Sequence, residues 1–183
     1  MNEKVKIHTE AINSVIKNDY INVIAKKLIT SIKKNSKVLI CGNGGSAADS
    51  DHIAAEFVGR FEKNRPPINA ISLCSNSSLI TAIGNDFGFE NIFSRQIQAI
   101  GNKNDILIAI STSGKSKNIL KAIQEALKLN LFVIFISGNN LKKKAKTKNF
   151  LAISIESKNT ATIQEAYMFL LHNVVREIEN NLN

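Results

Sequence analysis

Short apolar runs alternate along the chain with longer stretches in which apolar residues recur every three or four positions. Runs that are apolar on both faces and bounded by turn residues are typical of buried parallel strands, and five are present: 38–41, 68–73, 106–110, 131–136 and 150–155. Helical spacing predicts helices over 46–62, 77–100 in pieces, 116–129 and 162–181. This alternation predicts an α/β fold, a doubly wound parallel sheet of about five strands with helices on both faces.

The first 34 residues also carry apolar positions at helical spacing, from Ile12 to Ile32, and the pattern is interrupted near Asn18 and Asp19. They predict a long N-terminal helix or a pair of helices. A chain of 183 residues has the size of one domain. We therefore expect a single domain over 1–183, with a helical segment over 1–34 and a core with the C-terminal helix over 35–183.

Composition places the chain among ordinary globular proteins. Hydrophobic residues make up 44% and charged residues 21%, which excludes a disordered, collagen-like or disulfide-stapled chain. No apolar run approaches the roughly 20 residues that a membrane span needs, and no signal-peptide pattern is present, so a cytoplasmic protein without a membrane partner is expected. Cys41 and Cys74 have no metal-type spacing and are expected to be reduced thiols.

The formal net charge of +9 raises the possibility of a nucleic-acid partner. The excess comes from lysines scattered over polar faces and from one run, 141–148. That run has no interleaved aromatic residues to stack on bases, and the chain has few arginines and no helix-turn-helix pattern. A solvated lysine-rich surface is therefore the interpretation we adopt, and no nucleic-acid partner is expected.

Ligands of doubly wound sheets bind beyond the carboxyl ends of the strands, and two loops at such positions are unusual. The first, Cys41–Ala48, has three glycines and opens a helix, so its free N–H groups favour an anion. Its spacing also fits the dinucleotide fingerprint G-x-G-x-x-A. That fingerprint needs an acidic residue after the second strand, and Leu73–Asn76 supplies none, which disfavours a nicotinamide cofactor.

The second loop, Ser111–Ser116, places four hydroxyl groups and a glycine within six residues before a helix. A helix N-cap would need one hydroxyl, so four favour a phosphate surrounded by donors. The Walker pattern is absent, which disfavours nucleotide hydrolysis. Together the two loops predict a site for the phosphate of a sugar phosphate.

Two groups of polar side chains that could take part in chemistry lie on otherwise apolar helices. His52 and Glu56 are four residues apart and share a helix face, which fits a functional pair or a surface pair about equally. The final helix carries Gln164, Glu165 and His172 among apolar residues. Taken alone, His172 fits a core histidine better than a ligand.

Several of these segments, in the same order, resemble the phosphoheptose isomerases of the sugar isomerase (SIS) fold, a flavodoxin-like three-layer sandwich. The matching motifs are Cys41–Arg60, Asn64–Pro66, Gly84–Gly88, Phe93–Arg95, Ser111–Gly114 and Ile163–Glu165. The resemblance extends over about 35–180. It implies conversion of sedoheptulose 7-phosphate to D-glycero-D-manno-heptose 7-phosphate, for lipopolysaccharide or other surface glycans, by a homotetramer with active sites between subunits.

The resemblance also assigns roles to residues. It implies a base at Glu56, an opposing acid or base at His172, and one Zn²⁺ per subunit held by His52, Glu56, Gln164 and His172. Substrate-binding roles fall on Asn43, Gly44, Gly45, Ser46, Glu56, Asn85, Asp86, Ser111, Thr112, Ser113, Ser116 and Gln164. An aldose–ketose isomerisation through an enediol needs such a proton-transferring pair, together with stabilisation of the developing oxyanion.

The proposed zinc ligands pose a geometric problem. Gln164 and His172 would lie about 12 Å apart along a straight helix. The helix must then start after Gln164, or the ligands must come from two subunits.

Two positions depart from the family pattern: Thr162 stands where an arginine is usual, and Tyr167 where a histidine is usual. Two alternatives to a phosphoheptose isomerase therefore stay open. One is an isomerase of another sugar phosphate in surface-glycan synthesis. The other is a non-catalytic SIS adaptor of the replication initiator, although such adaptors lack counterparts of Glu56 and His172.

Overall fold

The computed structural model describes residues 2–138 and 147–182 and contains a five-stranded sheet, all of whose strands are parallel. The strand order is β2-β1-β3-β4-β5. The strands span Val38–Cys41 (β1), Ala70–Ser72 (β2), Ile106–Ser111 (β3), Phe132–Gly138 (β4) and Phe150–Ile155 (β5). The predicted doubly wound sheet is confirmed, and the apolar runs mark its strands because both faces of a parallel sheet are covered.

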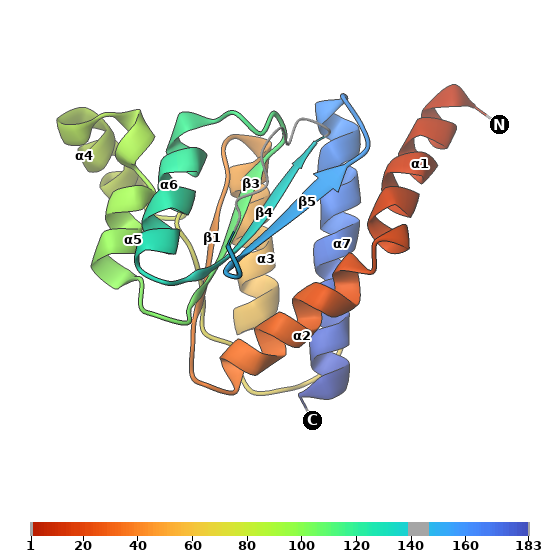
Figure 1. Ribbon diagram of the computed structural model, residues 1–183, viewed down its shortest axis with the longest axis horizontal. Helices are drawn as coiled ribbons and strands as arrows, with labels where there is room; N and C mark the ends of the chain where they lie inside the picture. Colours follow the sequence, from red (N-terminus) through yellow and green to blue (C-terminus); the bar gives the residue numbers. More distant parts are fainter. Residues whose placement is uncertain (1, 139–146, 183) are drawn as a thin grey trace.

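Helices lie on both faces of the sheet (Figure 1). One layer holds α4 (Ser77–Phe87), α5 (Ser94–Ile100) and α6 (Lys117–Lys128), with the short 3₁₀ helix η1 (Phe89–Asn91) between the first two. The other layer holds α1 (Glu3–Lys17), α2 (Tyr20–Ile32), α3 (Gly45–Val58) and α7 (Thr160–Asn181). Alternate strand residues face the two layers: Ile108 and Ile134 pack with α3 and α7, whereas Leu107 and Val133 pack with α6.

The N-terminal helices meet where the sequence pattern is interrupted. Asp19 adopts φ of 52°, the left-handed conformation that ends one helix and begins another. Asn2 caps α1 through its side chain, and Asn159 does the same for α7. The expected helix pair over the first 34 residues is therefore present, and both of its helices pack on α7.

The structure corrects one boundary of functional importance. Helix α3 was expected to reach residue 62, but it ends at Val58 with Gly59 as its cap. The chain then forms a loop whose amides at 61–63 bind a side chain of α7, as described below. Most of the lysine run 141–148 lies outside the described residues. None of the described helices is long and apolar enough to cross a membrane.

Candidate active site

The loop after β1 turns sharply into α3. Gly44 has φ of 57°, which strongly favours glycine, and a Cβ on Gly42 would collide with the backbone of Ser46. The N–H of Ser46 donates to the carbonyl of Asn43 at 3.0 Å. This compact turn places the N-terminus of α3 at the carboxyl edge of the sheet, where a helix N-terminus favours an anion.

The hydroxyl-rich loop after β3 lies at the same edge of the sheet. The Oγ atoms of Ser111 and Ser116 are hydrogen-bonded at 3.0 Å, and Ser113 Oγ accepts from the N–H of Lys115 at 3.2 Å. Ser116 occupies the N-cap position of α6, yet its side chain makes no capping hydrogen bond. The Ser116 hydroxyl therefore does not cap α6, which favours a phosphate-binding role for the loop over a purely structural N-cap.

An asparagine pair joins the two loops. Asn43 Nδ2 donates to Asn118 Oδ1 at 2.9 Å, and Asn118 Nδ2 donates to Asn43 Oδ1 at 2.7 Å. Asn118 is almost fully buried in the first turn of α6. Sequence reasoning did not find Asn118, because nothing local indicates a partner 75 residues away. The pair fixes the glycine loop relative to the hydroxyl loop.

Helices α3 and α7 lie side by side, and polar residues meet along their contact. In the first turn of α3, Gly45 faces Gln164 of α7, whose amide nitrogen occupies the space that a Cβ on Gly45 would need. One turn further, the buried Tyr167 hydroxyl donates to the Asp49 carboxylate, and its oxygen lies 2.9 Å from Ser46 Oγ. Burial, and then the bond to Asp49, raises the pKa of Tyr167 well above its usual value, so this phenol remains protonated.

The structure places three of the expected substrate-binding residues as follows. Ser46 is buried, and its Oγ lies 2.9 Å from the hydroxyl of Tyr167, the residue that stands in place of the usual histidine. Its one hydroxyl proton can go either to the Tyr167 oxygen or to a phosphate, and the phosphate role stays a prediction. Asn85 and Asp86 lie exposed on α4 and bond to each other at 2.8 Å. The bonds of the described residues do not tie them to either loop.

Further along the same helix pair, the two expected catalytic residues come together with two aromatic rings. His52 Nε2 lies 3.2 Å from Glu56 Oε1, and its ring meets the ring of His172 edge-on with centroids 5.1 Å apart. Phe61 stacks on the other side of His172, also at 5.1 Å. Burial first, and then the neighbouring His52, lowers the pKa of His172, so its imidazole is neutral near pH 7.

The donors of this cluster fit a zinc ion by type. Imidazole nitrogens and a carboxylate are common zinc ligands, and His172 Nε2 is buried without a hydrogen-bond partner among the described residues. However, no three His, Cys, Asp or Glu side chains of the described ranges form a metal cluster. One chain therefore supplies donors but not a complete, preformed site.

The position of Gln164 bears on the two alternatives for the zinc ligands, a final helix that starts after Gln164 or ligands from two subunits. Helix α7 begins at Thr160, so the alternative in which it starts after Gln164 is wrong. Within the chain, Gln164 packs against Gly45, at the glycine-loop end of the α3–α7 contact, while His172 lies two turns further along. The second alternative, ligands from two subunits, stays a prediction.

The loop after α3 contacts the backbone of Glu56. Arg65 donates to the backbone carbonyl of Glu56 at 2.6 Å and to that of Phe57 at 2.8 Å. The buried Glu179 carboxylate accepts the N–H groups of Phe61, Glu62 and Lys63 at 2.9–3.0 Å. Sequence reasoning quoted Asn64–Pro66 as a motif without a role, and missed Glu179 because its partners lie more than 110 residues away.

Arg65 and Glu179 also form a buried ion pair. Arg65 Nε lies 3.3 Å from Glu179 Oε1, and each side chain is 1% exposed. Arg65 Nε has no hydrogen-bond partner among the described residues, so its attraction to Glu179 is electrostatic. The pair keeps Phe61 packed against His172. It also fixes the position of the C-terminal end of α3.

The SIS domain family model matches residues 4–138, and the parallel sheet of order 2-1-3-4-5 with a glycine loop and a hydroxyl loop at its carboxyl edge agrees with it, so the chain is a SIS-domain protein. The chain is 46% identical to a phosphoheptose isomerase of Campylobacter jejuni over 154 residues, 83% of this chain and 81% of the relative. A relative from Burkholderia pseudomallei is 45% identical over 159 residues, 87% and 80% of the two chains.

Solved structures agree with these relatives. The phosphoheptose isomerase of Neisseria gonorrhoeae has a TM-score of 0.87 at 34% identity, covering 97% of this chain and 94% of its own. That of Francisella tularensis has a TM-score of 0.86 at 34% identity, covering 99% and 100%. This chain belongs to the phosphoheptose isomerase family.

Proposed function

We propose that the protein is an aldose–ketose isomerase that converts sedoheptulose 7-phosphate to D-glycero-D-manno-heptose 7-phosphate. The observation that carries this proposal is the meeting of Glu56 and His172 around His52, on two helices that begin at the carboxyl edge of the sheet. A carboxylate beside a neutral imidazole is a pair suited to general acid–base chemistry. Family membership supports the same reaction.

Most of the expected residues have a direct part in this reaction. Ser111, Thr112, Ser113 and Ser116 hold the phosphate with help from Ser46, while Asn43, Gly44, Gly45 and Gln164 line the sugar. Glu56 takes a proton from C1 of the ketose and returns it to C2, and His172 moves a proton between O1 and O2. The enediolate that forms as the C1 proton leaves carries negative charge on oxygen, which hydrogen-bond donors stabilise until O2 is protonated.

The direct test is incubation of the purified protein with sedoheptulose 7-phosphate, with the aldose product followed by NMR. Formation of the aldoheptose supports the proposal. Turnover of a different ketose phosphate in its place would assign the protein to another sugar, consistent with the unusual Thr162 and Tyr167. A folded protein inactive on all of these would favour the adaptor alternative.

We also propose a homotetramer that acts in the cytoplasm, without a nucleic-acid or membrane partner. Val5, Ile7, Ile16 and Val23 leave large apolar side chains 41–51% exposed on α1 and α2, and burying such side chains between subunits is favourable. An assembly would cover them, and a partner could bring Asn85 and Asp86 to the sugar. Light scattering coupled to size exclusion tests the oligomeric state, with four chains expected.

Zinc is the cofactor that we propose, at one ion per subunit. His52, Glu56 and His172 of one subunit would hold it. Gln164 of another subunit would be the fourth ligand. A zinc ion bound there would polarise the carbonyl oxygen of the sugar.

Zinc binding should stabilise the folded chain through His52. At free zinc about 100-fold above its Kd, the expected gain is about 2.7 kcal/mol, seen as a higher Tm than that of the EDTA-treated protein. His52→Ala should abolish this gain. His8→Ala is the matched control, because His8 pairs with Glu165 on the surface, 2.8 Å away. A gain that survives in His52→Ala, or that His8→Ala removes, would contradict the proposed ligands.

A further inference from the structure

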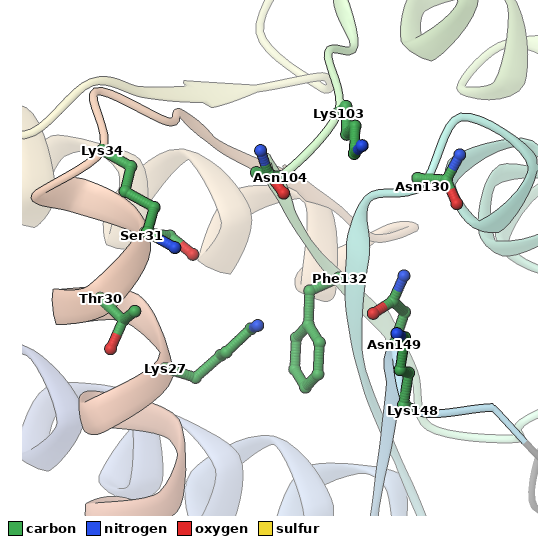
Figure 2. A pocket seen from close by; sticks show the side chains of 10 residues that line it. All are labelled: Lys27, Thr30, Ser31, Lys34, Lys103, Asn104, Asn130, Phe132, Lys148 and Asn149. Atoms are coloured by element: carbon green, nitrogen blue, oxygen red, sulfur yellow. The ribbon is translucent and has the colours of Figure 1, made fainter.

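A cavity of about 330 Å³ lies at the edge of the sheet opposite the two substrate loops. It opens between the last turn of α2 and the segments that lead into β3, β4 and β5 (Figure 2). Its walls, here called the lysine pocket, are Lys27, Thr30, Ser31, Lys34, Lys103, Asn104, Asn130, Phe132, Lys148 and Asn149. Because the strands are parallel, their starts lie at the edge away from the phosphate loops, so this is a separate site.

The charge of the lysine pocket is wholly positive. Four of its wall residues are lysines and none is acidic. In the described ranges, the lysines that form ion pairs are Lys37, Lys121 and Lys128, none of which lines the pocket. The segment 139–146 contains no Asp or Glu that could supply a counter-charge. Four ammonium groups around one cavity repel one another, and a bound anion would remove that repulsion.

The remaining walls supply neutral donors and one aromatic ring. Asn104 and Asn130 both adopt left-handed φ values, of 75° and 62°, and the N–H of Asn104 donates to the carbonyl of Asn130 at 3.3 Å. This bond holds two turns side by side at the pocket wall. Lys27 extends from α2 over the ring of Phe132, with its Nζ 4.3 Å from the ring centroid (Figure 2). The backbone turns at Asn104 and Asn130 and the contact of Lys27 with Phe132 therefore help to position the donors of the pocket.

We propose that the lysine pocket binds a small molecule carrying two or more phosphate groups. A phosphate monoester carries a charge of about −1.5 to −2 at neutral pH, so roughly two of them balance four lysines. The volume is in the range of small-molecule sites, which begins near about 300 Å³. A nucleic-acid surface would instead form an extended basic groove with several aromatic stacking platforms, and this pocket offers Phe132 alone.

Calorimetric titration with inorganic pyrophosphate tests this proposal. The titration uses the Ser111→Ala/Ser116→Ala variant, in which binding to the substrate loops is weakened, so the pocket is observed separately. Adding Lys34→Gln/Lys103→Gln should weaken pyrophosphate binding at least about tenfold. Lys26→Gln/Lys33→Gln is the control, because it changes net charge equally on exposed residues outside the pocket. It should bind pyrophosphate as its parent does.

Four results would overturn the proposal. Equal affinities with and without Lys34→Gln/Lys103→Gln, or an equal loss in the control, would show that the pocket lysines do not form a site. Orthophosphate binding as tightly as pyrophosphate would contradict the requirement for two phosphates. Displacement of pyrophosphate by a short single-stranded RNA at lower concentration would assign the surface to nucleic acid. Lys34→Gln/Lys103→Gln in the wild-type background should retain isomerase activity, so the outcome is independent of the proposed reaction.

Discussion

Replacing Glu56 by glutamine is expected to lower kcat about 10²- to 10⁴-fold, the usual contribution of a general base. The amide keeps the shape of the side chain but cannot accept the carbon-bound proton. KM should change much less, because the proposed phosphate ligands, in the loop Ser111–Ser116, are unchanged in this variant. Steady-state kinetics with sedoheptulose 7-phosphate measure both constants.

Asp51→Asn is the control for Glu56→Gln, since it makes the same chemical change at an exposed residue of the same helix, α3. It should leave kcat close to the wild-type value. His172→Ala should reduce kcat as Glu56→Gln does, because the proposed mechanism has both residues act on the same intermediate. A Glu56→Gln enzyme with wild-type kcat would show that the proton is removed by another group.

Glu179→Gln is expected to destabilise the fold by about 3–5 kcal/mol, the cost of breaking a buried ion pair by removing one partner. The amide would leave Arg65 without its counter-charge, and its NH2 group, which replaces one of the two carboxylate oxygens, would face one or two of the three backbone N–H groups that Glu179 accepts. Urea denaturation measures the loss. Glu177→Gln, two residues earlier on α7, is the control and should cost less than about 0.5 kcal/mol.

The cost of Glu179→Gln should depend on pH. Burial acts to raise the pKa of Glu179, but the amides of Phe61, Glu62 and Lys63, with Arg65, hold it below its ordinary value of 4.5. The stabilisation is therefore complete above pH 4.5 and is lost as the pH falls through the lower, folded-state pKa. The gap between wild type and Glu179→Gln should narrow below pH 4.5. A gap that widens with acidity would contradict this origin.

Local sequence pattern predicted the sheet and its two loops because the signals are local. A strand covered on both faces is a continuous apolar run, and β1 and β5 have the predicted boundaries. The loops stood out because glycines and hydroxyls cluster directly after strands. Glu56 and His172 rested on family resemblance, since a histidine on an apolar helix does not by itself distinguish a catalytic residue from a core residue.

What the sequence could not show are contacts between distant segments. The end of α3 was misplaced because the chain leaves the helix at Gly59 to bring its amides to Glu179, a residue of α7. Asn118 and Asp49 were missed for the same reason: each is significant only through its partner, Asn43 or Tyr167. Tyr167, a departure from the family pattern, is a buried link between α3 and α7.

The most direct test of the central claim is NMR of sedoheptulose 7-phosphate incubated with the zinc-loaded protein in D₂O. Proton transfer by Glu56 through an enediol predicts an aldoheptose 7-phosphate that carries deuterium at C2, to the extent that the abstracted proton exchanges with solvent. Glu56→Gln should form neither product nor deuterated substrate. Unchanged sedoheptulose 7-phosphate with the folded wild-type protein, without deuterium at C1, would contradict the account.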